Sequence, residues 1–213
     1  MDNEGEKELP ELAKNLKDYF DQASRLIVSK DEKDRNYLKL SHELKDTKEK
    51  VREPEARHVI CQVLSQNQVS HGIEVPTVGL YRFSGKGKRR ALIDLTIFED
   101  KHRLINIELK EGQPSKSDRK VSPIEKDVEK LRKEVVPGSA FFHILQKTDS
   151  GTVKAIQKKY ASAYKSVKEG KNKGWFLLYV ISVQDEKGCY IFFPDISTVN
   201  PLDLLKEYTQ FSI

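Results

Sequence analysis

The sequence is poor in the residues that mark secreted, zinc-binding and membrane proteins. Its two cysteines, Cys61 and Cys189, lie far apart, and neither has a second cysteine or a histidine at ligand spacing. A disulfide framework and a zinc site are therefore not expected, and both residues are interpreted as buried free thiols. No apolar run approaches the roughly 18 residues of a membrane span, and the charged first residues lack the apolar core of a signal peptide. The sequence predicts a cytoplasmic protein without a membrane partner.

Charged residues, by contrast, are abundant. The 213 residues include 38 Lys and Arg and 33 Asp and Glu, which gives a net charge of +5, while 37% of the residues are hydrophobic. That apolar share is enough to bury a core, and the length suits one α/β domain with an extension. The small positive excess is compatible with an anionic partner such as nucleic acid, although many soluble proteins carry as much.

The first 50 residues show helical periodicity only. Apolar side chains recur at helical spacing over residues 12–27, and a weaker pattern covers residues 37–44. Residues 1–50 hold too few apolar side chains for a core of their own, so they are interpreted as a helical N-terminal extension. This extension should pack on the main domain, residues 51–213, or on a second subunit, and the second arrangement would give a homodimer.

Within the main domain the hydrophobic period alternates between helical and strand spacing. A helix begins near Pro54, where Glu53 and Glu55 fall in the first turn and favour the helix dipole. The elements expected after it are strands at 73–83, 91–98 and 104–110, a helix at 124–134, a strand at 140–146, a helix at 152–169, strands at 175–183 and 189–193, and a short helix at 201–208. This order predicts an α/β fold in which helices flank a mixed central sheet.

The two strands at 91–98 and 104–110 carry charged residues inside apolar runs. If the turn between them is centred on Lys101, an antiparallel ladder places Asp94 directly opposite Glu108, and Lys110 shares the face of Glu108. The two carboxylates would then lie about 5 Å apart at Cβ. On both strands the alternate residues take the other face and are expected to form the buried core: Ile93, Leu95, Ile97, Ile105, Ile107 and Leu109.

This arrangement points to a bound cation. Like charges that face each other destabilise a sheet, and hard oxygen ligands favour Mg²⁺ or Mn²⁺. A divalent ion can polarise a phosphoryl oxygen and activate a water, and the Lys110 ammonium can orient that water or stabilise developing charge. A solvated hairpin face with ordinary charges is the alternative interpretation. It is weakened by the strongly apolar runs that Asp94 and Glu108 interrupt.

The order helix, strand, strand with Asp94, strand with Glu108-Leu109-Lys110, helix, strand resembles the PD-(D/E)xK nuclease superfamily, also called restriction-endonuclease-like. Asp94 matches the lone aspartate, with Ile93 in place of the usual proline, and Glu108 and Lys110 match the ExK element. The likeness covers residues 53–183. It implies a restriction-endonuclease-like sheet, Mg²⁺- or Mn²⁺-dependent hydrolysis of phosphodiester bonds, and DNA rather than RNA as substrate. It also implies a metal held by Asp94, Glu108 and the backbone carbonyl of Leu109.

Many members of this superfamily add a glutamate from the first helix. Glu55 is the first candidate for that position and Glu53 the second, although as first-turn acids both could equally serve the helix dipole alone. The alternative function is a nucleic-acid-binding or assembly module that keeps the fold and does not cleave. Loss of an acidic ligand or of the lysine would favour that module, and none is missing. His143, inside an apolar strand, is interpreted as a core histidine rather than a ligand.

Overall fold

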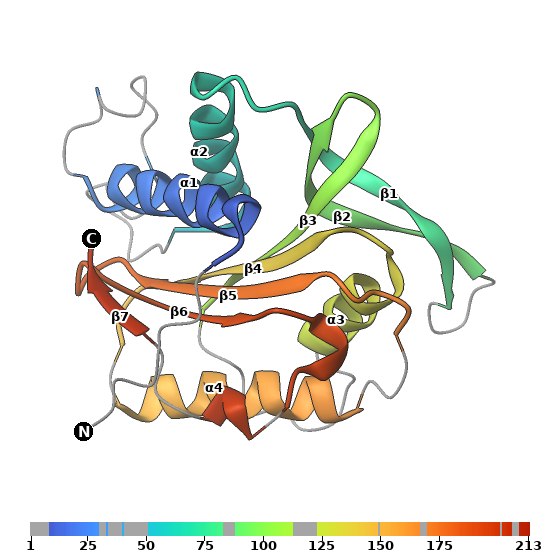
Figure 1. The fold of residues 1–213 in the computed structure, drawn as a ribbon. Helices are drawn as coiled ribbons and strands as arrows, with labels where there is room; N and C mark the ends of the chain where they lie inside the picture. The colour runs from blue at the N-terminus through green and yellow to red at the C-terminus, as the bar shows by residue number, and fades with distance from the viewer. Residues whose placement is uncertain are drawn as a thin grey trace.

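A mixed sheet runs through the molecule (Figure 1). The computed structural model of the protein describes residues 9–29, 33, 40, 51–82, 88–112, 123–148, 150–166, 170–200, 202–205 and 209–213. Within these residues seven strands form one sheet in chain order: β1 His71–Arg82, β2 Lys88–Glu99, β3 His102–Glu111, β4 Gly138–Leu145, β5 Trp175–Ser182, β6 Lys187–Phe193 and β7 Thr209–Ser212. Strands β3, β4 and β5 are parallel, and all other neighbours are antiparallel.

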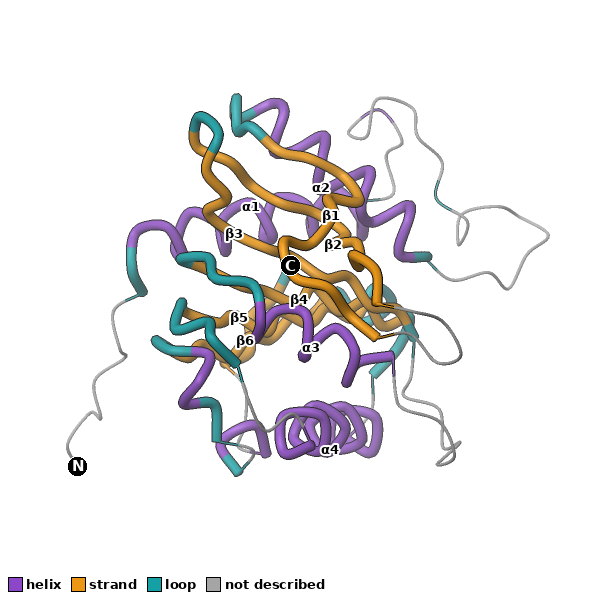
Figure 2. The backbone as a smooth tube through the Cα atoms, turned by 90° about the vertical axis from the view of Figure 1, so that its right-hand side faces the viewer, coloured by secondary structure: helices purple, strands orange, loops and turns teal. Residues whose placement is uncertain are grey.

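Helices cover both faces of the sheet (Figure 2). Helices α1 Glu11–Val28 and α2 Glu53–Gln66 lie on one face, and α3 Pro123–Lys133 and α4 Ser150–Ser166 lie on the other. Helices α3 and α4 connect the parallel strands, and the short 3-10 turns η3 Ile196–Thr198 and η4 Asp203–Leu205 lead towards β7. The predicted α/β fold with a mixed sheet flanked by helices is confirmed at this level. None of the described helices is long and apolar enough to cross a membrane.

Each face of the sheet has its own apolar core. Strands β4 and β5 are buried along their whole length because helices cover both of their faces, as is typical of parallel strands. Leu95, Ile107 and Leu109 enter the core under α1 and α2, as expected. Ile93 was expected beside Leu95 but lies in the core under α3 and α4, because β2 separates from β3 at this point and turns towards α3.

Helix α1 packs on the main domain rather than leaving its apolar face for a second subunit. Its stripe of Leu16, Phe20, Ala23 and Ile27 is fully buried. The Phe20 ring lies 4.9 Å from that of Phe142 on β4, centre to centre. The periodicity predicted this helix well, whereas the second helical pattern at 37–44 lies outside the described residues, apart from the buried Leu40.

The hairpin of β2 and β3 has the predicted register. Leu95 pairs with Ile107, Thr96 with Asn106 and Ile97 with Ile105, so the ladder follows the arrangement centred on Lys101. The pairing shifts by one residue only next to the turn. Glu108 and Lys110 share a face because side chains alternate along β3. The register decides which residues of β2 lie across from them.

The helix expected at 201–208 lies in part outside the described residues. Of those described, Asp203–Leu205 forms the 3-10 turn η4, and Thr209–Ser212 adds β7 to the sheet edge beside β6. Phe211 of β7 packs over Gly188, where an added Cβ would lie 2.1 Å from the Phe211 ring, and its ring lies 5.3 Å from that of Tyr179. Edge pairing and aromatic packing thus hold β7 on the sheet.

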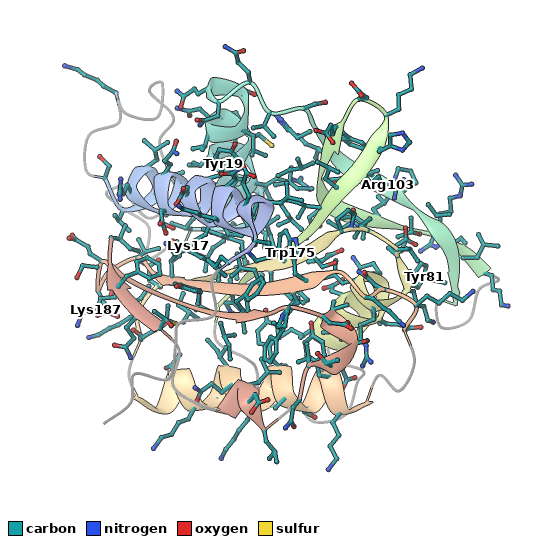
Figure 3. All side chains as sticks on the ribbon, viewed as in Figure 1. Lys17, Tyr19, Tyr81, Arg103, Trp175 and Lys187 are labelled. Atoms are coloured by element: carbon teal, nitrogen blue, oxygen red, sulfur yellow. The ribbon has the colours of Figure 1, made fainter. Side chains whose placement is uncertain are left out.

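Glu134, just after α3, fixes the shape of β1. The register of β1 against β2 shifts between Pro76 and Leu80. At this irregularity the buried carboxylate of Glu134 accepts hydrogen bonds from the backbone N–H groups of Val78 and Gly79, at 2.8 and 3.0 Å. The Tyr81 hydroxyl and the Arg103 guanidinium also donate hydrogen bonds to this carboxylate. Figure 3 shows both residues on the right-hand side of the molecule. The end of α3 is thereby anchored to the ribbon of β1 and β2.

Replacing Glu134 with alanine should therefore lower the free energy of unfolding by about 2 kcal/mol, because it leaves the buried Tyr81 hydroxyl and two partly buried backbone N–H groups without this acceptor. Urea denaturation measures this value. The control is Glu129→Ala on the same helix, since Glu129 forms an exposed ion pair with Lys133 and its loss should cost less than about 1 kcal/mol. Equal losses in the two variants would contradict the anchoring role.

Candidate active site

The sheet opens between β2 and β3 at the position of Asp94. Backbone pairing of these two fully described strands reaches Leu95 and Ile107, and beyond that point β2 pairs with β1 and β3 with β4. Asp94 is the first residue past the end of this ladder. Its Oδ2 accepts a hydrogen bond from the backbone N–H of Leu109 at 2.8 Å. The aspartate side chain thus bridges to β3 beside Glu108.

Strand β3 directs Glu108 and Lys110 towards α3. Because side chains alternate along a strand, Ile107 and Leu109 fill the core on the opposite face. The Glu108 side chain is 1% exposed and that of Lys110 is 15% exposed. A carboxylate buried to this degree is unusual unless it has a charged or metal partner. The structure therefore brings together the three residues that the sequence singled out.

Helix α3 supplies two further charged groups, Asp127 and Lys130, which lie one helical turn apart. Asp127 Oδ2 is 2.7 Å from Lys110 Nζ, and Asp127 Oδ1 is 2.7 Å from Lys130 Nζ. Lys130 Nζ also lies 2.7 Å from Glu108 Oε1. Glu108, Lys130, Asp127 and Lys110 thus form a chain of alternating charge that joins α3 to β3.

Glu108 is the most deeply buried member of this chain. Its Oε1 is in ion-pair contact with the Lys130 ammonium at 2.7 Å, and no other described group contacts this oxygen as a hydrogen-bond donor. Burial, with repulsion from Asp127 and Asp94, raises the pKa of Glu108 well above its usual range, against the opposing attraction of Lys130. A second cation beside this oxygen would favour the charged form.

The N-terminus of α2 approaches the same cluster. The Glu111 carboxylate, at the end of β3, accepts a hydrogen bond from the backbone N–H of Glu53 at 2.6 Å. This bond ties the strand that carries Glu108 to the first turn of α2. Glu53 Oε1 then lies 3.7 Å from Lys110 Nζ. Partial burial raises the pKa of Glu53; Lys110 opposes this shift, and repulsion from Asp94 adds to it.

Glu55, the first candidate from the sequence, has a different role. Its Oε2 accepts a hydrogen bond from the backbone N–H of Arg52 at 2.8 Å, as part of a capping box. A capping box requires the third helical side chain to turn back towards the helix start, whereas the first one, that of Glu53, is directed to Lys110. The structure thus brings Glu53 rather than Glu55 to the cluster, which reverses the order of the two candidates.

Both lysines of the cluster are held in their charged form. Burial opposes the charge of Lys110, but the Asp127 and Glu53 carboxylates outweigh it and raise its pKa above the ordinary value. Burial likewise opposes the charge of Lys130, and Glu108 and Asp127 raise its pKa. Three carboxylates (Glu53, Glu108 and Asp127) contact these two ammonium groups, and Asp94 is close enough to Glu53 and Glu108 to raise their pKa values. The site thus has more acids than lysines.

The residues present fit a divalent cation. Carboxylate oxygens are the ligands that Mg²⁺ and Mn²⁺ prefer, and Mg²⁺ is often bound through one or two carboxylates with water completing its shell. Glu108 Oε1, buried and without a hydrogen-bond partner, is the observation that carries this fit. No group of three or more His, Cys, Asp or Glu side chains in the described part of the chain is arranged around one metal position. At Glu108 the Lys130 ammonium already lies against the oxygen that a metal would use.

His143 on β4 is a satisfied core residue, as predicted. Its Nδ1 lies 3.1 Å from the Tyr160 hydroxyl and its Nε2 lies 3.0 Å from the backbone oxygen of Gly112. Burial lowers the pKa of His143 to about 4, so the ring is neutral at pH 7. The contact with Gly112 holds the end of β3, two residues after Lys110.

Sequence reasoning missed Asp127, Lys130 and Glu111. Asp127 lies at helical spacing from Ile124 and Leu131, both of which are buried, so a charged residue on an apolar stripe was the available signal. Lys130 follows Asp127 by three residues, and no pattern in the sequence marks it as a site residue. Cys61 and Cys189 are free, as expected, but both are only partly buried.

Comparison of the chain with protein-family models, with curated proteins and with solved structures found no match. The comparisons therefore assign neither a family nor a function to this chain. The function has to be inferred from the chemistry of the site itself.

Proposed function

We propose that the protein is a metal-dependent nuclease of the restriction-endonuclease-like type, with Asp94, Glu108 and Lys110 in its active site. The observation that carries this proposal is the opening between β2 and β3, where these three side chains converge. Glu108 there keeps a buried oxygen without a hydrogen-bond partner. A solvated hairpin face does not bury a carboxylate in this way, so a bound cation explains the arrangement better.

The order of the elements also supports the proposal. Helix α2 precedes three antiparallel strands, with Asp94 on the second and Glu108 and Lys110 on the third. Helix α3 and the parallel strand β4 follow. This is the order on which the resemblance to PD-(D/E)xK nucleases was based, and the paired register of β2 and β3 agrees with it.

In this proposal Asp94, Glu108 and the backbone carbonyl of Leu109 hold Mg²⁺ or Mn²⁺. Such an ion supplies Lewis acidity and a water of lowered pKa when it is bound. Lys110 cannot be a ligand because its ammonium has no lone pair. Fixed by Asp127, it orients the attacking water or stabilises negative charge on the phosphoryl oxygens. Glu53 lies on the other side of Lys110 and helps to hold it.

DNA is the proposed substrate, because the resembled superfamily favours DNA over RNA. The net charge of +5 suits a polyanion. Exposed basic residues, Lys88, Arg89 and Arg90, occupy the start of β2, the strand that carries Asp94. Contacts of these side chains with phosphates would place the backbone of the nucleic acid along the ribbon of β1 and β2.

Cleavage assays with plasmid DNA, single-stranded DNA and RNA test the proposal. We expect DNA cleavage in Mg²⁺ or Mn²⁺ and none in EDTA, because the water that attacks depends on the ion. Asp94→Asn, purified identically, controls for contaminating nucleases and should be inactive. A parent protein that binds nucleic acid and never cuts it, with any divalent ion, would instead favour the binding or assembly module.

A further inference from the structure

Lys130 occupies a cation site made of oxygens. Its Nζ lies 2.7 Å from Glu108 Oε1, 2.7 Å from Asp127 Oδ1 and 2.9 Å from the backbone oxygen of Leu92. Two carboxylates and one backbone carbonyl are also the kind of set that binds a hard divalent cation. The Lys130, Asp127 and Glu108 side chains are 12%, 11% and 1% exposed, so this ammonium is largely removed from water.

Lys130 is the cationic partner of Glu108 in the protein without metal. Its Nζ lies 2.7 Å from Glu108 Oε1, and its positive charge favours the ionised form of this carboxylate. A buried carboxylate needs a cation nearby when it is ionised. Lys130 supplies that cation at the oxygen that a metal would use.

The structure also offers the Lys130 side chain another place to lie. A pocket of about 150 Å³ next to it is lined by Tyr81, Ala91, Leu92, Lys126, Asp127, Glu129 and Lys130. A lysine stem has four flexible carbon–carbon bonds, so Lys130 can leave Glu108 without movement of α3.

We propose that Lys130 is the resident counter-ion of Glu108 and competes with the divalent cation for that carboxylate. This inference rests on the proposed function, since it concerns the same metal site. Lys130 neutralises the acid cluster while no metal is bound and withdraws towards the pocket when one binds. Lys130 therefore sets the metal affinity of the site, and removal of its charge should strengthen metal binding rather than weaken it.

Isothermal titration calorimetry with MnCl₂ on the full chain tests the direction of this change in metal affinity. Lys130→Gln keeps a donor for the Leu92 oxygen and removes the charge, so it should bind Mn²⁺ roughly 10–100-fold more tightly than the parent, the size by which the partners of ligands tune metal affinity. Lys130→Arg keeps the charge and should show no such gain. The control is Lys101→Met, an exposed lysine at the turn between β2 and β3, which should bind Mn²⁺ as the parent does.

The outcomes separate this inference from the proposed function. Mn²⁺ binding that tightens in Lys130→Gln alone supports the competition, including the case in which only this variant binds detectably. Equal or weaker binding in Lys130→Gln than in a parent that binds Mn²⁺ overturns the competition and leaves the nuclease proposal intact. No binding in the parent or in any variant overturns both. If Lys130→Gln does not fold, Lys130→Met, with a similar stem, is titrated in its place and the same outcomes apply.

Discussion

Replacing Lys110 with methionine should lower the rate of phosphodiester cleavage by about 10²–10³-fold, the size seen when one preorganised stabilising group is lost. Methionine keeps most of the volume of the lysine stem and removes the charge. The Lys110 ammonium is held by Asp127 at 2.7 Å and by Glu53 at 3.7 Å, and its raised pKa keeps it protonated at neutral pH. In the proposed mechanism its contribution is therefore expected to be electrostatic, not that of a base.

Metal binding should not weaken in Lys110→Met. The ammonium is no ligand, and its removal makes the acid-rich cluster more negative, which favours a divalent cation. Asp127 keeps a partner in Lys130, so the fold should be retained. Single-turnover cleavage with saturating DNA, together with calorimetry for Mn²⁺, distinguishes the catalytic step from binding.

Lys101→Met serves as the control for this prediction, because Lys101 is exposed at the turn of the same hairpin, at its other end. It should cleave at the parent rate. A folded Lys110→Met protein that also cleaves at the parent rate would remove Lys110 from the mechanism. A variant that loses Mn²⁺ binding would instead place Lys110 in the architecture of the metal site.

The convergence of Asp94, Glu108 and Lys110 can be predicted from the sequence because two local rules determine it. Side chains alternate along a strand, and the apolar run decides which face is buried. Leu95, Ile107 and Leu109 are buried on one face, which leaves Glu108 and Lys110 for the other. The short turn around Lys101 then sets the register. The prediction departs from the structure at Ile93 and Asp94, where β2 no longer pairs with β3. The pair expected between Asp94 and Glu108 is absent, and the Asp94 side chain accepts a hydrogen bond from the Leu109 N–H instead.

The charged groups of α3 depend on how a helix docks on a sheet, which no local rule determines. Asp127 could be marked as unusual from the apolar stripe, but its partner Lys110 lies 17 residues earlier, on β3. The choice between Glu53 and Glu55 depends similarly on the capping box at Arg52 and on the Glu111 carboxylate. These are tertiary contacts, and helical periodicity carries no information about them.

Replacing Glu108 with glutamine should abolish both divalent-ion binding and cleavage, a larger effect than that expected for Lys110. The neutral amide is a poor ligand for a hard cation, and Asp94 alone with a backbone carbonyl offers only one charged oxygen donor. Calorimetry with MnCl₂ and the cleavage assay in Mg²⁺ measure the two losses. Cleavage lost with Mn²⁺ binding unchanged would mean that the ion is held elsewhere.

The stability of Glu108→Gln should move in the opposite direction to its function. Glutamine is nearly isosteric with glutamate, and its amide oxygen can still face Lys130. The change removes the charge of a buried carboxylate in an acid-rich cluster, so the repulsion of Glu108 by Asp127 and Asp94 is lost. The free energy of unfolding in EDTA, from urea denaturation, should therefore equal or exceed that of the parent.

Asp94→Asn is the variant with which Glu108→Gln should be compared. Its amide oxygen can keep the hydrogen bond from the Leu109 N–H, so the hairpin should stay intact while a metal ligand loses its charge. Both variants are then expected to be folded, unable to bind Mn²⁺ and inactive. A Glu108→Gln protein that is clearly less stable than the parent would show that the buried ion pair with Lys130 supports the fold. A carboxylate kept at a cost to stability, in contrast, is what selection for a function predicts.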